Sequence, residues 1–303
     1  MVPLYLMLLI CGAVTGLAQE PAAQPLEANV VTRVTAGGRL QMRALAAAYP
    51  DRIAETAFRD GEWALRIDQT WFYWADGRLL PEPERFNSRL YTAIRFYNYT
   101  LGPLQPRRVD DETAERLRAR SQAPAAQGLP RHNAFLDSLY GISSYRDASQ
   151  HIVEITFLGM KTRAHRMIVE PLAQVEREIR SLMVTDQAVR DAVADLQQVS
   201  TFSWREIAGT NRRSYHSYGV AVDLIPRTYR NRFGYWRWAM QSGIEEWWDL
   251  PAEQRWSMPQ TVIDSFEKHG FIWGGKWLSF DPIHFEYRPE VILLSRWRDA
   301  GIH

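Results

Sequence analysis

Two short stretches near the carboxyl end decide how the fold and chemistry of this chain are interpreted: SYHSYGVAVD at residues 214–223 and FDPIHFE at residues 280–286. Together they supply two imidazoles and one carboxylate, from His216, Asp223 and His284. A zinc ion that catalyses hydrolysis takes three protein ligands of these kinds and keeps one open position for water. The two stretches therefore predict one zinc ion held by these three side chains.

Both stretches also carry a local pattern that could bring the ligands together. Residues 220–225 alternate and are rich in β-branched side chains, which predicts a strand. Gly219 lets the backbone turn between the loop histidine and the strand carboxylate without a steric penalty. Residues 284–287 read as extended, so His284 and Glu286 should share one face. A loop ligand and two strand ligands could then point at one metal ion.

Asp281 stands three residues before the last predicted ligand and is available to take a proton from water. A purely structural zinc ion would instead have a fourth protein ligand and would need no base, and Glu286 could be that ligand. The residues alone therefore leave a hydrolytic site and a non-catalytic zinc module both open.

The pattern SxHxxGxAxD followed by DxxHFE resembles the zinc peptidases of the VanY and VanX type, from about Trp204 to Glu286. That family includes D-alanyl-D-alanine carboxypeptidases, dipeptidases and L-alanyl-D-glutamate endopeptidases, and the Hedgehog signalling domain shares its fold. The resemblance implies one zinc ion, a peptidoglycan stem peptide as substrate, and these roles: metal ligands at His216, Asp223 and His284, the catalytic acid/base at Asp281, and a substrate contact at Ser214.

The family also uses an arginine upstream of the first histidine, which holds the substrate and polarises the scissile carbonyl. The chain has no Arg-Ser element at the expected distance. Arg205 is the preferred substitute, because a Trp-Arg pair suits the wall of a site, although a surface ion pair would explain it equally well. The other possible arginines are Arg212, Arg213, Arg163 and Arg166.

The amino terminus predicts secretion. Residues 4–18 are apolar and end in small residues, which is typical of a signal peptide cleaved after Ala18 and too short for a comfortable membrane span. An uncleaved amino-terminal anchor is the alternative. Cys11 is the only cysteine, so the mature chain would hold no disulfide and no thiolate metal site. The expected location is periplasmic or extracellular, with no stable membrane span after cleavage.

The net charge and the aromatic content limit the kinds of binding partner that we expect. A net charge of +1 over 303 residues argues against nucleic acid, which would need a basic face. The chain has 12 Trp and 13 Tyr, and these could either fill a core or line a groove for sugar or peptide.

Mixed strands and helices without βαβ alternation predict an α+β fold. We expect an accessory region of unknown role at 19–130 and a zinc peptidase domain at 131–303, joined by a linker at 121–130. The resemblance implies a Hedgehog/DD-peptidase-like antiparallel sheet with flanking helices in the second region. The remaining expected elements are a β-meander at 62–80, a strand at 151–157, and helices at 84–99, 171–183 and 259–269.

The function that the resemblance implies is a secreted zinc metallopeptidase that cleaves stem peptides in the manner of a D-alanyl-D-alanine carboxypeptidase. An L-alanyl-D-glutamate endopeptidase, a hydrolase with another peptide substrate, and a non-catalytic zinc-containing binding module stay as alternatives.

Overall fold

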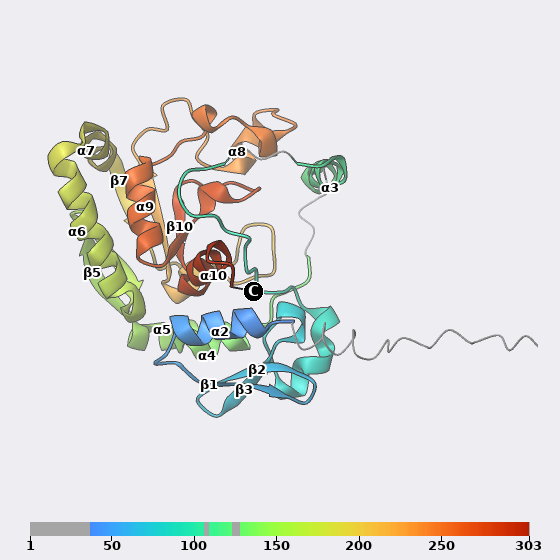
Figure 1. The fold of residues 1–303 in the computed structure, drawn as a ribbon. Coiled ribbons are helices and arrows are strands. Elements are labelled where there is room, and N and C mark those ends of the chain that lie inside the picture. Colours follow the sequence, from blue (N-terminus) through green and yellow to red (C-terminus); the bar gives the residue numbers. More distant parts are fainter. Residues whose placement is uncertain (1–36, 106–108, 123–127, 303) are drawn as a thin grey trace, which may run out of the picture.

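A computed structural model describes residues 37–105, 109–122 and 128–302, arranged as helices around three antiparallel sheets (Figure 1). The predicted signal peptide lies outside the described residues. The strands are β1 Ile53–Arg59, β2 Glu62–Ile67, β3 Thr70–Tyr73, β4 Leu80–Pro81, β5 Ile152–Phe157, β6 Met160–His165, β7 Leu196–Ser200, β8 Ala221–Pro226, β9 Phe271–Trp273 and β10 His284–Tyr287. The α-helices are α2 Arg39–Ala48, α3 Asp111–Gln122, α4 Ala134–Tyr140, α5 Tyr145–His151, α6 Val169–Thr185, α7 Gln187–Ala194, α8 Trp236–Gln241, α9 Gln260–Lys268 and α10 Pro289–Asp299.

The sheet that carries the two sequence stretches has the strand order β7-β8-β10-β9, and its neighbours are antiparallel. In its register His284 pairs with Asp223 and Phe285 pairs with Val222. Because successive side chains alternate between the two faces, the two polar residues share one face and the two apolar residues share the other.

The apolar face of this sheet packs against α9. The Phe285 ring stacks on Phe266 with centroids 4.0 Å apart, and both side chains are fully buried. α6 lies along α9 on the outer side (Figure 1). Burying this face fixes the register of β10, because a slip of one residue would turn His284 toward the helix.

The amino-terminal region forms a second layer below this sheet. β1 to β4 make a four-stranded antiparallel meander in sequential order, and α2 lies between the meander and α10 (Figure 1). Tyr49, directly after α2, donates a hydrogen bond of 3.0 Å to Glu290 of α10. The meander confirms the sequence prediction, which missed only its first strand.

The helix predicted at 84–99 was wrong. A 3₁₀ helix covers Glu82–Leu90, and the chain then runs irregularly to residue 105. The backbone N–H of Thr92 donates to the Pro130 carbonyl and that of Ile94 donates to the Gly77 carbonyl, both at 2.8 Å. These amides are satisfied by distant segments, so this stretch has no need of helical hydrogen bonds.

Residues 97–102 of this stretch are fastened to the carboxyl-terminal region by a buried carboxylate. Glu267 of α9 accepts hydrogen bonds from the Tyr99 hydroxyl at 2.5 Å and from the Gly102 amide at 2.9 Å. It also pairs with buried Lys276. The Tyr97 ring stacks on Trp277 with centroids 5.5 Å apart.

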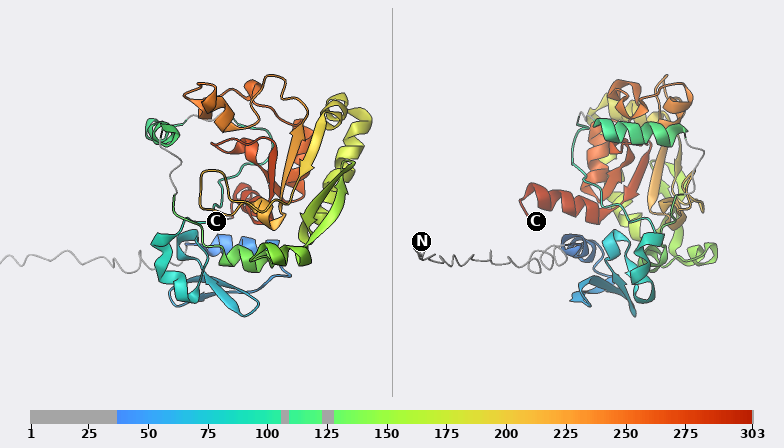
Figure 2. Two further views of the ribbon diagram at one scale, coloured as in Figure 1. Left: turned by 180° about the vertical axis from the view of Figure 1, so that it is seen from behind. Right: turned by 90° about the vertical axis from the view of Figure 1, so that its right-hand side faces the viewer.

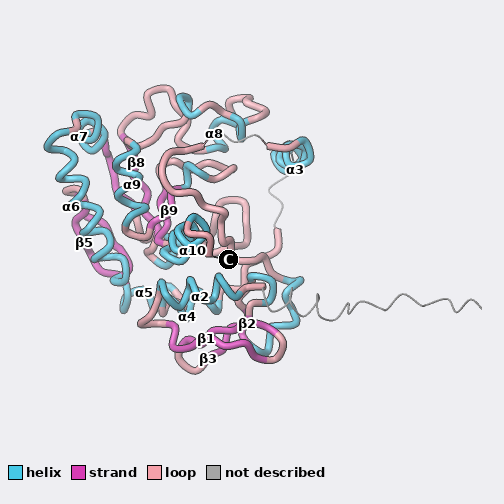
Figure 3. Tube along the Cα trace, in the orientation of Figure 1, coloured by secondary structure: helices cyan, strands magenta, loops and turns pink. Residues whose placement is uncertain are grey.

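The long connection between β8 and α9 is mostly loop (Figure 3) and holds a second, smaller core. Ala114 and Leu117 of α3, which lies beside α8 (Figure 2), pack into it. The aromatic residues in this core are Trp236, Trp247, Trp248 and Phe280. Several of the tryptophans are therefore core residues. Trp277 lines a pocket, and Trp236 contributes both to this core and to the pocket lining.

The structure confirms an α+β architecture with antiparallel sheets. The helices expected at 171–183 and 259–269 and the strand at 151–157 are present as α6, α9 and β5. The division at residue 130 stays a prediction, and residues 123–127 of the expected linker lie outside the described part of the chain. The largest hydrophobic cluster contains residues from both sides of that division, among them Leu45, Phe72, Val222 and Phe266. Within the described residues, no helix combines the length and apolarity that crossing a membrane requires.

Candidate metal centre

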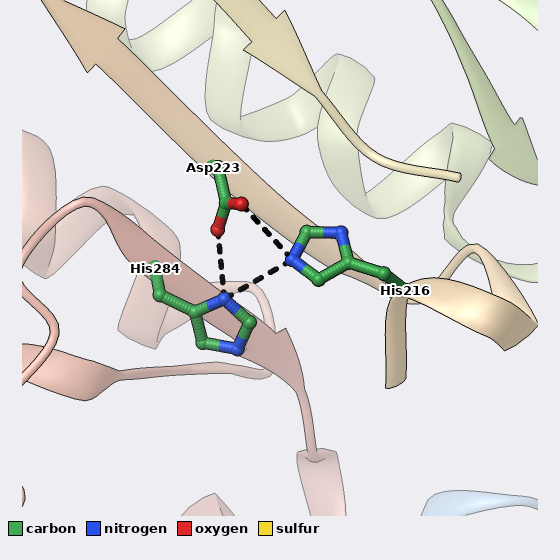
Figure 4. A group of neighbouring side chains, drawn as sticks. All are labelled: His216, Asp223 and His284. Atoms are coloured by element: carbon green, nitrogen blue, oxygen red, sulfur yellow. Dashed lines mark hydrogen bonds and ion pairs between the residues drawn. The ribbon is translucent and has the colours of Figure 1, made fainter. Parts of the chain in front are cut away.

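The structure brings His216, Asp223 and His284 together, although 68 residues separate the two histidines (Figure 4). Nε2 of His216 lies 3.2 Å from Oδ2 of Asp223, and Nδ1 of His284 lies 2.8 Å from Oδ1 of the same carboxylate. The two ring nitrogens are 3.2 Å apart. Each residue thus turns one ligand atom toward a common point.

His216 is held by the segment that precedes it and by its own turn. It lies in a 3₁₀ turn, Tyr215–Tyr218, and its Nδ1 is 2.6 Å from the Thr201 carbonyl. Gly219 ends the turn at φ 66°, and a Cβ there would lie 2.5 Å from the Ile152 side chain. The predicted need for glycine at this position is confirmed by both its conformation and its surroundings.

Ser214 caps the same turn. Its hydroxyl accepts a hydrogen bond of 3.3 Å from the backbone N–H of His216, and the side chain is buried. A capping role accounts for this serine, and its predicted contact with substrate stays a prediction.

Glu286 holds the outer nitrogen of His284. Its Oε1 lies 3.2 Å from Nε2 of the ring, on the same sheet face two residues along β10. Arg288 lies behind it, with Nη1 3.7 Å from Oε2 of Glu286. Carboxylates that fix the second nitrogen of a ligating imidazole set its tautomer and orientation. This placement makes Glu286 a positioning residue for His284 and removes it from the position of a fourth ligand.

Burial and the neighbouring groups shift the pKa values of Asp223 and His284 in opposite directions. Burial raises the pKa of Asp223, but the charges and hydrogen bonds of His216 and His284 outweigh it and hold this pKa below its usual value. Burial lowers the pKa of His284, yet its hydrogen bonds to Asp223 and Glu286 outweigh that effect and raise it. A cation entering the site would therefore displace a proton from His284.

The donor set fits zinc. Two imidazole nitrogens and a carboxylate oxygen are ordinary ligands of a catalytic zinc ion at about 2.0–2.2 Å each. For tetrahedral directions this spacing puts the ligand atoms roughly 3.3 Å from one another, close to the observed 2.8–3.2 Å. Both outer ring nitrogens have acceptors, as a metal site requires.

Asp281 lies on the loop that leads into β10. Its backbone N–H donates to the Gly274 carbonyl at 3.0 Å, and a Cβ on Gly274 would lie 2.6 Å from the Asp281 carbonyl oxygen. Burial raises the pKa of Asp281 to about 7, against the opposing charge of His284 and with Asp223 adding to the rise. Its Oδ1 is buried and has no hydrogen-bond partner among the described residues. The carboxylate is thus free to exchange a proton near neutral pH.

Arg205 lies beside the metal centre. Its Nη2 is 3.7 Å from Oδ2 of Asp223, and the side chain keeps 46% of its surface exposed. The Ser217 hydroxyl fixes its backbone, accepting from the Arg205 N–H at 2.9 Å and donating to the Arg205 carbonyl at 2.8 Å. The structure therefore brings Arg205 to the site, and the ion pair that it forms among the described residues is with Asp223 and not with Glu206.

Three of the alternative arginines are engaged elsewhere. Arg213 pairs with Asp137 at 2.5 Å and lies over the Trp204 ring. Arg163 lies over Phe202, and Arg166 donates to the Gln150 carbonyl. Arg212 instead lines a pocket of about 140 Å³ that reaches Asp281.

That pocket contains residues that the sequence did not single out. Its walls include Arg95 and Tyr97 from the amino-terminal region and Arg131 from the start of the predicted peptidase domain. The sequence also gave no indication of Thr201, which contacts His216, or of Ser217, which contacts the Arg205 backbone. Their roles depend on contacts between distant segments, and only the SxHS pattern at residues 214–217 could have indicated Ser217.

Two parts of the chain match known families. Residues 208–287 match a family described as D-alanyl-D-alanine carboxypeptidase, and residues 41–96 match a domain of unknown function (DUF8518). No curated protein and no solved structure matches the chain significantly. The first match contains the three metal-site residues and Asp281, so this part of the chain is a peptidase-type hydrolase domain similar to D-alanyl-D-alanine carboxypeptidases.

Proposed function

We propose that this protein is a secreted, zinc-dependent peptidase that cleaves peptidoglycan stem peptides in the manner of a D-alanyl-D-alanine carboxypeptidase of the VanY and VanX type. One observation carries the proposal. The three ligand atoms converge within 4.8 Å of one another, beside a buried carboxylate oxygen of Asp281 that has no partner among the described residues, inside the segment that matches the peptidase family.

His216, Asp223 and His284 would hold the zinc ion. Bound there, zinc would supply a Lewis acid and lower the pKa of a water molecule. Asp281, once deprotonated, takes the proton of the attacking water and later returns it to the amine of the leaving group. The Arg205 guanidinium, next to Asp223, would stabilise negative charge that develops on the scissile carbonyl oxygen.

The position of Glu286 argues against the non-catalytic zinc module. A structural site would use a fourth protein ligand, whereas Glu286 contacts the outer nitrogen of His284. The unpartnered oxygen of Asp281 also has no use in a structural site. Location outside the cytoplasm rests on residues 1–18 alone and stays part of the proposal.

An endopeptidase is the second candidate. The pocket beside Asp281 shares Arg95, Tyr97, Trp277 and Ser279 with a larger cavity of about 600 Å³. The two neighbouring cavities could together receive a chain that extends beyond the scissile bond, as cleavage next to the sugar-linked L-alanine would need.

Mass spectrometry of purified muropeptides after incubation with the zinc-loaded protein tests the proposal. Loss of one terminal D-alanine identifies a carboxypeptidase, and release at the L-alanine bond identifies an endopeptidase. Asp281→Asn is the matched control, and any cleavage that survives in it comes from a contaminant or another mechanism. A wild-type protein that binds zinc and cleaves no muropeptide would contradict the proposal.

A further inference from the structure

The pocket beside Asp281 is lined by an unusual number of cations. Two carboxylates line it, Asp281 and Glu286. The arginines that line it are Arg95, Arg131, Arg212, Arg237 and Arg288. An excess of guanidinium groups around a small cavity favours an anionic occupant.

Not all of these arginines are available to a ligand. Arg288 is buried and committed, because its Nε donates to Glu290, its Nη2 donates to the Arg95 carbonyl, and its Nη1 faces Glu286. It neutralises carboxylates of the protein itself. The argument for a ligand therefore rests on other arginines.

Three of the other arginines still have N–H groups available for a ligand: Arg95, Arg131 and Arg237. The Arg95 side chain is exposed, and its guanidinium makes no hydrogen bond or ion pair with any residue the structure describes. Arg131 is only 7% exposed, yet its Nε has no hydrogen-bond partner within the described part of the chain. Nε of Arg237 is likewise buried and finds no partner among the residues at 37–105, 109–122 and 128–302.

Buried N–H groups without an acceptor are costly, and each one in a native structure calls for an explanation. The remaining nitrogens show that the side chains are held in place. Arg131 donates to the Arg213 carbonyl and lies over the Tyr215 ring, and Arg237 donates to the Ala208 carbonyl at 3.1 Å. Donors that are both fixed and unsatisfied suit a carboxylate, which accepts two hydrogen bonds from one guanidinium.

We propose that Arg95, Arg131 and Arg237 form a carboxylate-binding subsite beside Asp281, so that an arginine of the amino-terminal region takes part in recognising a free carboxylate of the substrate. This inference rests on the proposed peptidase function and makes it more specific. It also gives the amino-terminal region a task, since Arg95 belongs to the segment that matches the domain of unknown function.

Arg95 is placed by several contacts. Arg288 donates to its carbonyl at 2.9 Å, and the preceding Ile94 is buried. Two residues further on, Tyr97 stacks on Trp277. The backbone on both sides of Arg95 is therefore held against the carboxyl-terminal region, and its side chain lines the pocket.

Steady-state kinetics on matched peptides tests the subsite. The reference is L-Ala-γ-D-Glu-L-Lys-D-Ala-D-Ala, compared with the same peptide amidated at the glutamate α-carboxyl and with one amidated at the carboxyl terminus. In Arg95→Gln we expect KM for the acidic reference to rise roughly tenfold, the loss of about one charged hydrogen-bond pair. We expect little change in kcat and unchanged zinc content.

The amidated peptides identify which carboxylate is bound. The peptide that lacks the recognised carboxylate should be a poorer substrate for the wild type and should be insensitive to Arg95→Gln. Arg177→Gln, at an exposed arginine of α6 that pairs with Glu170, is the matched control and should behave as wild type. Equal effects of Arg95→Gln on all three peptides, or no effect even when combined with Arg131→Gln, would overturn the subsite.

Binding measurements separate this inference from the proposed function. If the wild type cleaves none of the peptides, calorimetric titration of the zinc-loaded protein with the same three peptides still tests whether the carboxylate-binding subsite exists. Tighter binding of the acidic peptide that is lost in Arg95→Gln supports the subsite although the peptidase proposal has failed. Equal binding of all three peptides refutes it.

Discussion

Oε1 of Glu286 lies 3.2 Å from Nε2 of His284, on the side of the ring that faces away from Asp223. The carboxylate therefore orients the imidazole and determines which nitrogen is turned toward the metal. We predict that Glu286→Gln lowers zinc affinity by about 10–100-fold while all three ligands remain, because outer partners of ligating histidines commonly have effects of this size. Competition with a chromogenic chelator measures the affinity. Glu267→Gln is the control, because Glu267 is a buried carboxylate that contacts none of the three predicted metal-binding residues. Equal zinc affinity in Glu286→Gln and wild type would refute the positioning role.

Asp281→Asn should retain zinc and lose roughly a hundredfold to ten-thousandfold in turnover, the usual effect of removing a general base. His284→Ala should lose zinc and activity together, since it removes a ligand. Metal analysis and peptide hydrolysis on the same samples separate the two outcomes. Normal turnover by Asp281→Asn would shift the role of base to another group.

The pH dependence of activity should follow Asp281. Burial raises its pKa to about 7, and a base works only when deprotonated, so kcat/KM should rise with pH. A bound divalent cation nearby would lower this pKa, which places the acid limb at or below about pH 7. Asp281→Glu should shift the limb. An acid limb at the same pH in wild type and Asp281→Glu would contradict this assignment.

Arg205→Ala should reduce kcat strongly and leave zinc content unchanged, because the guanidinium lies beside Asp223 without being a ligand. Arg205→Lys should restore activity only in part, since an ammonium cannot reproduce the planar fork. Arg213→Ala is an informative comparison. Its guanidinium pairs with Asp137, so its loss should lower stability more than turnover. If Arg213→Ala instead lowered turnover and Arg205→Ala lowered stability, Arg213 would be the arginine that acts on the substrate.

His165 should make stability fall in acid. Its Nε2 is 2.8 Å from the Tyr140 carbonyl, and its Nδ1 accepts from the Met167 N–H at 3.0 Å. Burial lowers its pKa to about 4, whereas an unfolded histidine titrates near about 6.5. The unfolded chain then binds the extra proton, so this contribution is complete above about pH 6.5 and is lost as pH falls toward 4, by about 3 kcal/mol.

Urea unfolding of the wild type and His165→Gln at pH values across this window measures that loss. The variant should be less stable at neutral pH and should show a weaker dependence on pH. His269→Gln removes a histidine that is partly exposed and pairs with Glu178, and serves as the matched control. Parallel curves for wild type and His165→Gln would show that His165 does not carry the effect.

The clustering of His216, Asp223 and His284 was predictable because its signals are local. The spacing from His216 to Asp223 covers one turn and one strand, and the period of β10 places His284 and Glu286 on the same face. The pocket beside Asp281 had no such signal. Arg95 and Arg131 reach it through long-range packing, and no periodicity marks a residue whose neighbour is nearly two hundred positions away.

The stretch from Tyr91 to Tyr99 shows the same limit in the fold itself. Its aromatic residues blur any helical period, and each one contacts a different part of the chain, with the partners His132, Trp74, Trp277 and Glu267 for Tyr91, Phe96, Tyr97 and Tyr99. Local propensity favoured a helix, but hydrogen bonds to Gly77 and Pro130 determined an irregular path. Tertiary contacts commonly override propensity in this way.

The contacts of Glu267 determine how this protein can be divided into fragments or combined with others in chimaeras. Two of its hydrogen-bond donors, the Tyr99 hydroxyl and the Gly102 amide, come from the region before residue 130. A fragment that begins after that point would expose the surface beneath Tyr99 and remove one wall of the pocket. Grafts and chimaeras should therefore exchange both regions together, because residues from both line the pocket and both contact Glu267.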